Sequence, residues 1–403
     1  MVADSPTLSY NPRLDEIIGE TAFTFLAIAR ELQSRGKKVI SFGIGQPDFP
    51  TPKHIREAAK KALDEGFTGY TETAGIPELR EAIAEYLSRY GNVEPDEVVV
   101  TTGAKTALFI ALAAYLRPGD EIIVPEPSYY AYSQVAKYLG AKPIFVPMRF
   151  GPEGFSLDIE AIDAAVTDRT RMIVINNPQN PTGAVFDKDQ VQGLMEIARK
   201  HSLIVVADEI YDNFVYEGAS FYSVLSEPDW RDYVVYVNGF SKTFSMTGWR
   251  LGYLVVRKEV IPRILDLAVS VYSCAPSFAQ KAGVTALRGD WTPVREMIAE
   301  FERRAKRLYE ILSEARGVEA YKPQGAFYMF PRVRGLLEKT GLTVEELVNK
   351  LLYDYGVLVL PGTSFPDKAG ADHVRISFAT SMENIEEGAR ILVEASKELS
   401  GSH

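Results

Sequence analysis

The chain of 403 residues contains very little cysteine and histidine. Its one cysteine, Cys274, cannot form an internal disulfide, which is consistent with a reducing compartment. The four histidines, His54, His201, His373 and His403, do not have the spacing of metal ligands. We therefore do not expect a metal enzyme.

Long apolar runs and an excess of positive charge are also absent. No run approaches the ~18 apolar residues of a membrane span, and residues 1–10 have neither the basic nor the apolar region of a secretory signal. Lysine and arginine together number 44 against 54 aspartates and glutamates, a net charge of −10, which disfavours nucleic acid or an anionic membrane as the main partner. We expect a cytoplasmic globular protein whose ligands are small molecules.

The middle of the chain alternates short apolar runs with amphipathic segments. The apolar runs are rich in Val, Ile and Leu, which predicts strands buried on both faces of a mostly parallel sheet. They lie at residues 98–103, 121–127, 141–147, 171–178, 203–211, 233–239 and 251–257. Segments with helical spacing lie between them, at residues 104–116, 129–140 and 187–201. This alternation predicts an α/β domain with helices on both faces of the sheet.

The pattern changes near residue 290, and a chain of this length usually forms more than one domain. A long charged helix is predicted over 296–315, followed by strand-like pieces between helices. A further helix is predicted over 20–36. We predict that residues 46–290 form a large cofactor-binding domain, and that a smaller α+β domain is built from both chain ends, residues 1–45 and 291–403.

Polar residues follow several of the predicted strands, and such strand ends are where ligands bind in α/β sheets. In "TTGAKTALF" a glycine turn leads into a helix, and the backbone N–H groups of Gly103, Ala104 and Lys105 suit a phosphate. Taken alone, an ordinary strand–turn–helix joint is the simpler interpretation of this motif. "NNPQNPTGAV" (176–185) forms a rigid bend with side-chain amides available, including that of Asn180.

Asp208 and Lys242 are the two charged residues that a purely structural interpretation explains least well. Asp208 emerges from a buried strand, where a carboxylate needs a cation or a donor, unless it caps the next turn; Tyr211 lies three residues on. Lys242 has an amine that forms a Schiff base with an aldehyde if its pKa is lowered. A lone lysine is ordinarily a solvated surface group, but Ser241 and Arg250 flank this one with donors for a phosphate. A phosphate, an aldehyde and a ring nitrogen facing a carboxylate together describe pyridoxal 5'-phosphate.

The sequence resembles the class I aminotransferases of the fold type I pyridoxal-phosphate superfamily, particularly the aspartate aminotransferases. The likeness covers nearly the whole chain, and its motifs occur in the order of the family. They are "GIGQPDFPTP", "YTETAGIPELREAIAEY", "NNPQNPTG", "ADEIYDNFVYEG", "NGFSKTFSMTGWRLGY", "GAFYMFPRV" and "VRISFAT". The resemblance implies the fold of that superfamily and a two-stage transamination through pyridoxamine phosphate.

The resemblance also implies which residues bind the cofactor. Lys242 would form the Schiff base and carry the proton between the substrate Cα and the cofactor C4′. Asp208 would pair with the pyridine nitrogen, and Tyr211 and Asn180 would hydrogen-bond the phenolic oxygen. Tyr129 would stack over the ring, at a position where many members have tryptophan. The residues implied for the phosphate are Gly103, Ala104, Lys105, Ser241 and Arg250.

Substrate binding and assembly follow from the same resemblance. Arg375 would clamp the substrate α-carboxylate through its planar guanidinium, and Gly45 would let the backbone approach that carboxylate. Tyr129 and Asn180 are also implied to contact the substrate. Tyr70 matches a tyrosine that reaches the phosphate of the neighbouring subunit, so a homodimer with shared active sites is expected.

The side chain of the preferred substrate is the least determined part of the prediction. Lys105 is our candidate for the cation that binds a second carboxylate; the alternative is that it ends a helix and faces solvent. We predict aspartate and glutamate as donors, and 2-oxoglutarate and oxaloacetate as acceptors. Tyr129, Tyr130 and Tyr132 leave open an aromatic or broad-specificity aminotransferase.

Other functions remain as alternatives on the sequence alone. A carbon–sulfur lyase or a cyclopropane-forming synthase on the same scaffold would share the lysine and the aspartate. A transcription regulator would need a helix-turn-helix domain, and the residues before "VISFGIG" are too few and too apolar to supply one. "GIGQPD" lacks the third glycine and the following helix of a dinucleotide-binding loop. A catalytically inactive cofactor binder is disfavoured by the presence of both Lys242 and Arg375.

Overall fold

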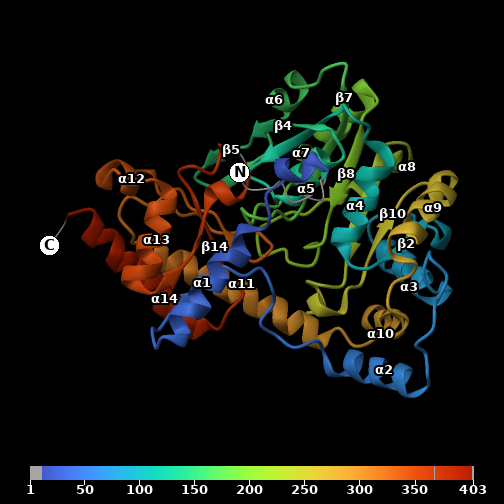
Figure 1. Ribbon diagram of the computed structural model, residues 1–403, viewed down its shortest axis with the longest axis horizontal. Coiled ribbons are helices and arrows are strands. Elements are labelled where there is room, and N and C mark those ends of the chain that lie inside the picture. The colour runs from blue at the N-terminus through green and yellow to red at the C-terminus, as the bar shows by residue number, and fades with distance from the viewer. Residues whose placement is uncertain (1–10, 367, 402–403) are drawn as a thin grey trace, which may run out of the picture.

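A computed structural model describes residues 11–366 and 368–401 of the chain. Residues 1–10, for which no secretory signal is predicted, and His403 lie outside the described residues. Figure 1 shows a large part built on a central sheet and a smaller, mainly helical part beside it. Within the described ranges, no helix has the length and apolar character needed to cross a membrane.

The large part contains a seven-stranded sheet in which every apolar run predicted as a strand takes part. Only β10 runs antiparallel to its neighbours, β2 and β9, and the other pairs are parallel. The carboxyl ends of the remaining six strands therefore meet at one edge. The strand order is β2 (Val98–Thr101), β10 (Gly252–Val255), β9 (Val234–Gly239), β8 (Ile204–Asp208), β7 (Thr170–Asn176), β3 (Glu121–Glu126) and β4 (Lys142–Pro147).

Both faces of this sheet are buried, which explains why its strands are continuously apolar rather than alternating. In β8, Val206 belongs to one core cluster, whereas Val205 and Ala207 belong to the cluster on the other face. Helices cover the two faces and flank the sheet (Figure 1). They are α2 (Lys53–Asp64), α3 (Pro77–Leu87), α4 (Ala104–Tyr115), α5 (Ala131–Tyr138), α6 (Ile159–Ala164), α7 (Lys188–His201), α8 (Trp230–Tyr233), α9 (Ile261–Tyr272) and α10 (Ser277–Arg288).

The beginning of α4 packs unusually closely on the sheet. A Cβ atom placed on Gly252 of β10 would lie 2.3 Å from the backbone nitrogen of Ala104, so only glycine permits this approach. The close contact fixes the N-terminus of α4 at the edge of the sheet where the strands end. The free N–H groups of the first turn of α4 are thereby positioned next to the other strand-end residues.

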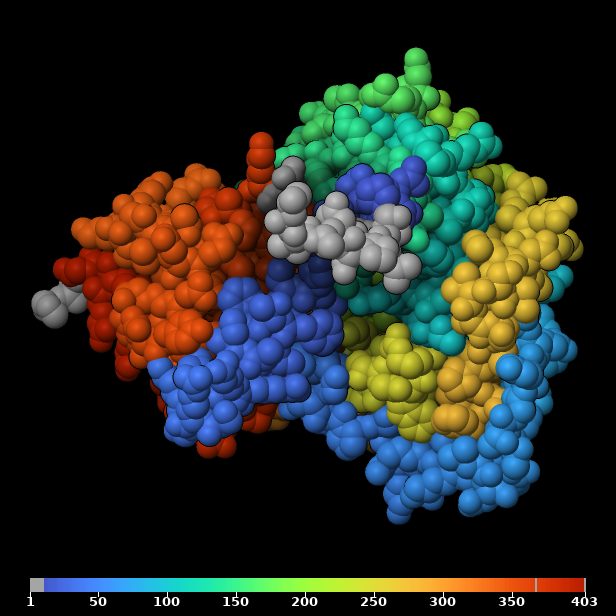
Figure 2. Space-filling view, viewed as in Figure 1, coloured from blue at the N-terminus to red at the C-terminus, as the bar shows by residue number. Residues whose placement is uncertain are grey.

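The smaller part combines segments from the two ends of the chain. β1 (Ile40–Ser41) pairs in parallel with β12 (Val357–Leu358), and Ala29 of α1 (Thr21–Ser34) packs with Leu352 of α13. Figure 2 shows α1, in blue, lying against the C-terminal elements, in orange and red. The remaining elements are α11 (Thr292–Leu312), β11 (Tyr328–Met329), α12 (Arg334–Thr340), α13 (Val344–Tyr355), β13 (Leu360–Pro361), β14 (Val374–Ser377) and α14 (Met382–Leu399).

The division expected from the sequence, with residues 1–45 and 291–403 in one domain and residues 46–290 in the other, stays a proposal. α1 and β1 pack with the C-terminal elements, whereas the N–H of Ile18 donates a hydrogen bond to Oε1 of Gln134 in α5 of the large part at 2.8 Å. The long helix expected over 296–315 is α11, which begins earlier. A separate hairpin of the large part, β5 (Arg149–Gly151) and β6 (Gly154–Ser156), was not expected from the sequence.

Candidate active site

A pocket of about 370 Å³ lies where the strands of the large sheet end and the smaller part begins. It collects most of the residues that the sequence singles out, although they come from segments spread over the whole chain. Those lining it are Gly45, Ala104, Lys105, Tyr129, Asn180, Asp208, Tyr211, Ser241, Lys242, Arg250 and Arg375. Gly103 adjoins the pocket through its neighbour Ala104, and Tyr70 does not line it.

Lys242 follows β9 and places its amine inside this pocket. Its Nζ donates a hydrogen bond to the carbonyl oxygen of Gly45 at 2.6 Å. Burial lowers the pKa of the Lys242 amine to about 8; Arg375 lowers it further, and the charges of Glu20 and Asp208 oppose the shift. Roughly a tenth of this amine is therefore uncharged at pH 7, far more than for an exposed lysine with a pKa of about 10.4, and the uncharged form is the one that acts as a nucleophile or a proton acceptor.

This lowered pKa predicts how the reactivity of the Lys242 amine depends on pH. Below pH 8 the amine of Lys242 is mostly protonated and unreactive, and above pH 8 it is mostly free. In protein stripped of bound small molecules, we expect acylation of Lys242 to rise with pH around a midpoint near 8. Surface lysines, with a typical pKa of about 10.4, provide the internal reference in the same peptide map. A midpoint for Lys242 shared with the surface lysines would contradict the environment described here.

Asp208 ends β8 and presents a buried carboxylate to the pocket. Its Oδ2 accepts a hydrogen bond from the hydroxyl of Tyr132 at 2.8 Å, and its Oδ1 accepts one from the backbone N–H of Ile210 at 3.2 Å. Burial raises the pKa of Asp208, whereas these two donors and the Lys242 charge lower it. A cationic group that enters the pocket would lower the pKa of Asp208 and so favour its ionised form. The contact from Tyr132 was not predicted.

The N-terminus of α4 and the loop after Lys242 form a cluster of donors. Gly103 has φ = +90°, and a Cβ there would lie 2.4 Å from Nη2 of Arg250, so only glycine leaves room for this guanidinium. Arg250 is held in place because its Nη1 donates to the carbonyl oxygen of Thr247 at 2.7 Å. The hydroxyl-bearing Ser241 lines the same pocket. Helix N–H groups, a hydroxyl and a guanidinium form a donor set that fits a phosphate.

Arg375 lies in β14 and is buried, with only 4% of its surface exposed. Its Nη2 donates to the carbonyl oxygen of Gly43 at 2.5 Å, and its Nη1 donates to Oδ1 of Asn180 at 3.3 Å. Within the described part of the chain, its buried Nε has no hydrogen-bond partner. Burial lowers the pKa of Arg375. A buried cation that is bound by neutral oxygens and retains an unused donor fits an incoming carboxylate.

Tyr328 completes the wall between Tyr211 and Arg375. Its hydroxyl lies 2.8 Å from that of Tyr211, and its ring centroid lies 4.7 Å from the Arg375 guanidinium carbon. A Cβ on Gly45 would lie 2.2 Å from the Tyr328 hydroxyl, so a side chain at position 45 would clash with this tyrosine. The approach of the Gly45 backbone to a substrate carboxylate stays a prediction. Tyr328 belongs to the motif "GAFYMFPRV", but its place in the pocket was not predicted from the sequence.

Lys105 lines the pocket, but it is not a free cation. Its Nζ forms an ion pair with Oε2 of Glu20 at 3.3 Å and contacts the hydroxyl of Tyr130 at 3.2 Å. Half of the Lys105 side chain is exposed. Glu20 was not predicted from the sequence, and no local pattern indicates it, because 85 positions separate it from Lys105.

Two further tyrosines were predicted to contact the cofactor, and only Tyr129 of the two lines the pocket. Tyr129 lines the pocket, and its ring makes edge contacts with Tyr130 and Tyr132 at centroid distances of 4.9 and 5.7 Å. Tyr70 is 91% exposed and does not line the pocket of its own chain. The expectation that Tyr70 reaches a neighbouring subunit stays a prediction.

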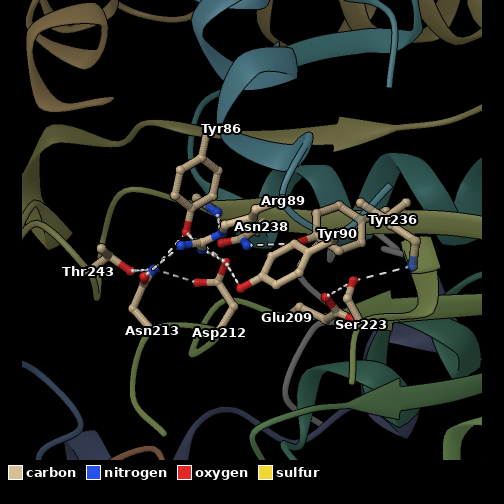
Figure 3. A network of polar contacts seen from close by, with 12 residues as sticks. Tyr86, Arg89, Tyr90, Glu209, Asp212, Asn213, Ser223, Tyr236, Asn238 and Thr243 are labelled. Atoms are coloured by element: carbon tan, nitrogen blue, oxygen red, sulfur yellow. Dashed lines mark hydrogen bonds and ion pairs between the residues drawn. The ribbon is translucent and has the colours of Figure 1, made fainter. Parts of the chain in front are cut away.

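A buried polar network supports the loop that carries Lys242 (Figure 3). Asp212 lies four residues after the end of β8. Its Oδ2 accepts a hydrogen bond from Nη2 of Arg89 at 2.9 Å, and the two side chains form an ion pair. The neighbouring Asn213 donates to the hydroxyl of Thr243 at 3.1 Å. Thr243 directly follows Lys242, so the network ties the lysine loop to the loop that follows Asp208.

A sequence profile described as aminotransferase class I and II matches residues 37–392. The chain belongs to this aminotransferase family. It is 48% identical to an aspartate aminotransferase of Sulfurisphaera tokodaii over 98% of each chain. Its structure is similar to that of an aspartate aminotransferase from Rhizobium meliloti, with a TM-score of 0.91, 34% identity and coverage of 97% and 99% of the two chains. It is also similar to an aromatic aminotransferase from Pyrococcus horikoshii, with a TM-score of 0.85, 41% identity and coverage of 93% and 99%.

These similarities confirm the class and the fold predicted from the sequence. The protein is an aminotransferase, and its mostly parallel, helix-covered sheet is the fold of the type I pyridoxal-phosphate enzymes. Since the relatives include both aspartate and aromatic aminotransferases, family membership leaves the substrate side chain open.

Proposed function

We propose that this aminotransferase uses pyridoxal 5'-phosphate to move amino groups from aspartate and glutamate to 2-oxoglutarate and oxaloacetate. The observation that carries the proposal is one pocket that joins a buried lysine of lowered pKa, a buried carboxylate and a cluster of phosphate donors. Members of the class I family depend on this cofactor.

The donor set of the pocket fits each functional group of the cofactor. The N-terminus of α4, Ser241 and Arg250 would hold the phosphate, since Gly103 leaves the space that a side chain would fill. Asp208 would hold the pyridine nitrogen, and Tyr211 and Asn180 would hold the phenolic oxygen. When bound, the cofactor supplies an aldehyde that condenses with amines and a ring that withdraws electrons from the substrate Cα.

The chain's own residues would then bind and orient the substrate and move its proton. Arg375 would bind the α-carboxylate, because its unused Nε and its Nη groups form a planar fork. Lys242 would take the proton from the substrate Cα with its Nζ and deliver it to C4′ of the cofactor. A pKa of about 8 suits both directions near neutral pH. Tyr132 would keep the Asp208 carboxylate oriented.

The substrate class rests on Lys105, the half-exposed cation at the mouth of the pocket. A dicarboxylic substrate requires a second cation beyond Arg375, and Lys105 would provide it. The relatives named as aspartate aminotransferases support this assignment. The second candidate is an aromatic or broad-specificity aminotransferase, which the contiguous rings of Tyr129, Tyr130 and Tyr132 favour.

Replacing Lys105 by alanine tests the substrate class. We expect kcat/KM for aspartate to fall about tenfold more than kcat/KM for phenylalanine or alanine, because only aspartate loses a charge-assisted contact, which typically contributes about 1.5 kcal/mol or more. Lys188→Ala is the matched control, because Lys188 is an exposed lysine in the first turn of α7, away from the pocket. Equal losses for all three amino donors would remove Lys105 as the selecting residue.

We also propose a homodimer in which Tyr70 of each subunit reaches the phosphate site of the other. The exposed ring of Tyr70 and the exposed Val269 and Val271 of α9 support an association of subunits through the large part. The cytoplasmic location expected from the sequence stays a prediction.

A further inference from the structure

Glu20 brings a carboxylate into the substrate pocket from the N-terminal segment. It directly precedes α1, but its side chain makes no capping hydrogen bond to that helix. The side chain is 25% exposed, lines the pocket and forms an ion pair with Lys105. In the described part of the chain, Lys105 is the one cation with which Glu20 forms an ion pair. The pocket therefore contains its own carboxylate on the lysine assigned to the substrate.

This ion pair changes what a substrate side chain meets. With Glu20 in place, the charge of Lys105 is neutralised, and the surrounding surface is aromatic: the Lys105 Nζ lies 5.5 and 5.4 Å from the ring centroids of Tyr129 and Tyr130. An uncharged or aromatic side chain fits this surface without leaving an unpaired charge. A side-chain carboxylate is attracted by Lys105 but repelled by Glu20 for as long as Glu20 stays.

We propose that Glu20 determines specificity as an exchangeable internal carboxylate. When the substrate side chain is uncharged, Glu20 stays on Lys105. When the substrate is dicarboxylic, its distal carboxylate takes the place of Glu20 on Lys105, and Glu20 turns to solvent. This inference rests on the proposed function, in which Lys105 selects dicarboxylic substrates.

The structure gives two reasons why the exchange costs little. Glu20 is already partly exposed, and its helix loses no cap when the side chain moves away. Half of the Lys105 side chain is also exposed, and ion pairs of this kind contribute little net stability. A pair that is readily exchanged lets one pocket accept two classes of side chain.

The test replaces Glu20 by glutamine, which keeps its size but cannot neutralise Lys105. In the complete enzyme, the ratio of kcat/KM for aspartate to kcat/KM for phenylalanine is expected to rise about threefold to fivefold. The ratio is the proper readout, because Glu20 also influences the pKa of Lys242, and that effect acts on both substrates. Glu31→Gln is the matched control: Glu31 lies in α1, is exposed and pairs with Arg35 outside the pocket.

The same substitution in the Lys105→Ala background shows whether Glu20 acts through Lys105. We expect the E20Q shift in the ratio to vanish there. An equal shift in both backgrounds would overturn the exchange, since Glu20 would then act by general repulsion. If K105A lowers the ratio but E20Q leaves it unchanged, the role of Glu20 is overturned and the proposed function stands. If K105A leaves the ratio unchanged, Lys105 is not the selector and both assignments are overturned.

Equilibrium binding provides a readout that does not depend on turnover. Maleate is an unreactive dicarboxylate, and 3-phenylpropionate is an unreactive acid with an uncharged aromatic end. By calorimetry on the complete enzyme, E20Q is expected to tighten maleate binding about threefold to fivefold and to leave 3-phenylpropionate binding within twofold. Equal changes for the two acids would contradict the proposal.

Discussion

Replacing Lys242 by alanine is expected to lower the turnover of every amino donor by at least about 10⁴-fold. The substitution removes the amine that donates a hydrogen bond to Gly45 inside the pocket and has a pKa lowered to about 8 by burial. The rest of the donor set stays, so the variant is expected to fold and to bind pyridoxal phosphate without a covalent bond. Single-turnover kinetics with aspartate measures the loss.

Lys281→Ala provides the control for the loss of a lysine elsewhere. Lys281 lies in α10 and forms an ion pair with Glu78 away from the pocket, so its removal is expected to leave turnover within about twofold. Circular dichroism and thermal unfolding of both variants show whether folding is preserved. Near-normal turnover in a folded Lys242→Ala protein would rule out the proposed mechanism.

Replacing Arg375 by lysine is expected to lower kcat/KM at least about 100-fold for all amino donors alike. The positive charge is kept, but the fork that reaches Gly43, Asn180 and the α-carboxylate at once is lost. Because a lysine at this buried position would also be left without full hydrogen bonding, KM is expected to account for most of the change. Steady-state kinetics with aspartate, alanine and phenylalanine tests this pattern.

Arg332→Lys is the matched control, because Arg332 also lies in the smaller part but pairs with Glu319 and does not line the pocket. We expect it to change kcat/KM by less than about twofold. If R375K affected aspartate alone, Arg375 would bind the distal carboxylate instead of the α-carboxylate. The assignment of the two ends of the substrate would then be wrong.

The strands of the large sheet could be predicted from the sequence because burial on both faces leaves a local signal. Val205, Val206 and Ala207 are apolar in succession since neighbouring residues enter opposite core clusters. The direction of the chain then places residues such as Asp208 and Asn176 at one edge of the sheet. The prediction that they line one pocket follows from this topology.

The contacts between distant segments could not be predicted in the same way. Tyr132 was recognised as an aromatic residue near the cleft, but its hydrogen bond to Asp208 spans 76 positions and depends on where α5 lies relative to the end of β8. Glu20 and Tyr328 enter the pocket from the smaller part. No local sequence pattern predicts the position of that part relative to the sheet. The family resemblance indicated which motifs matter, but the pairing of Glu20 with Lys105 needed the structure.

The central claim is that the amine of Lys242 binds pyridoxal phosphate covalently within this pocket. The most direct measurement is reduction of the cofactor-loaded protein with borohydride, followed by peptide mapping by mass spectrometry. The account predicts one pyridoxyl-phosphate group per chain, on the peptide that contains Lys242. No incorporation, or incorporation spread over surface lysines while Lys242 stays unmodified, would contradict it.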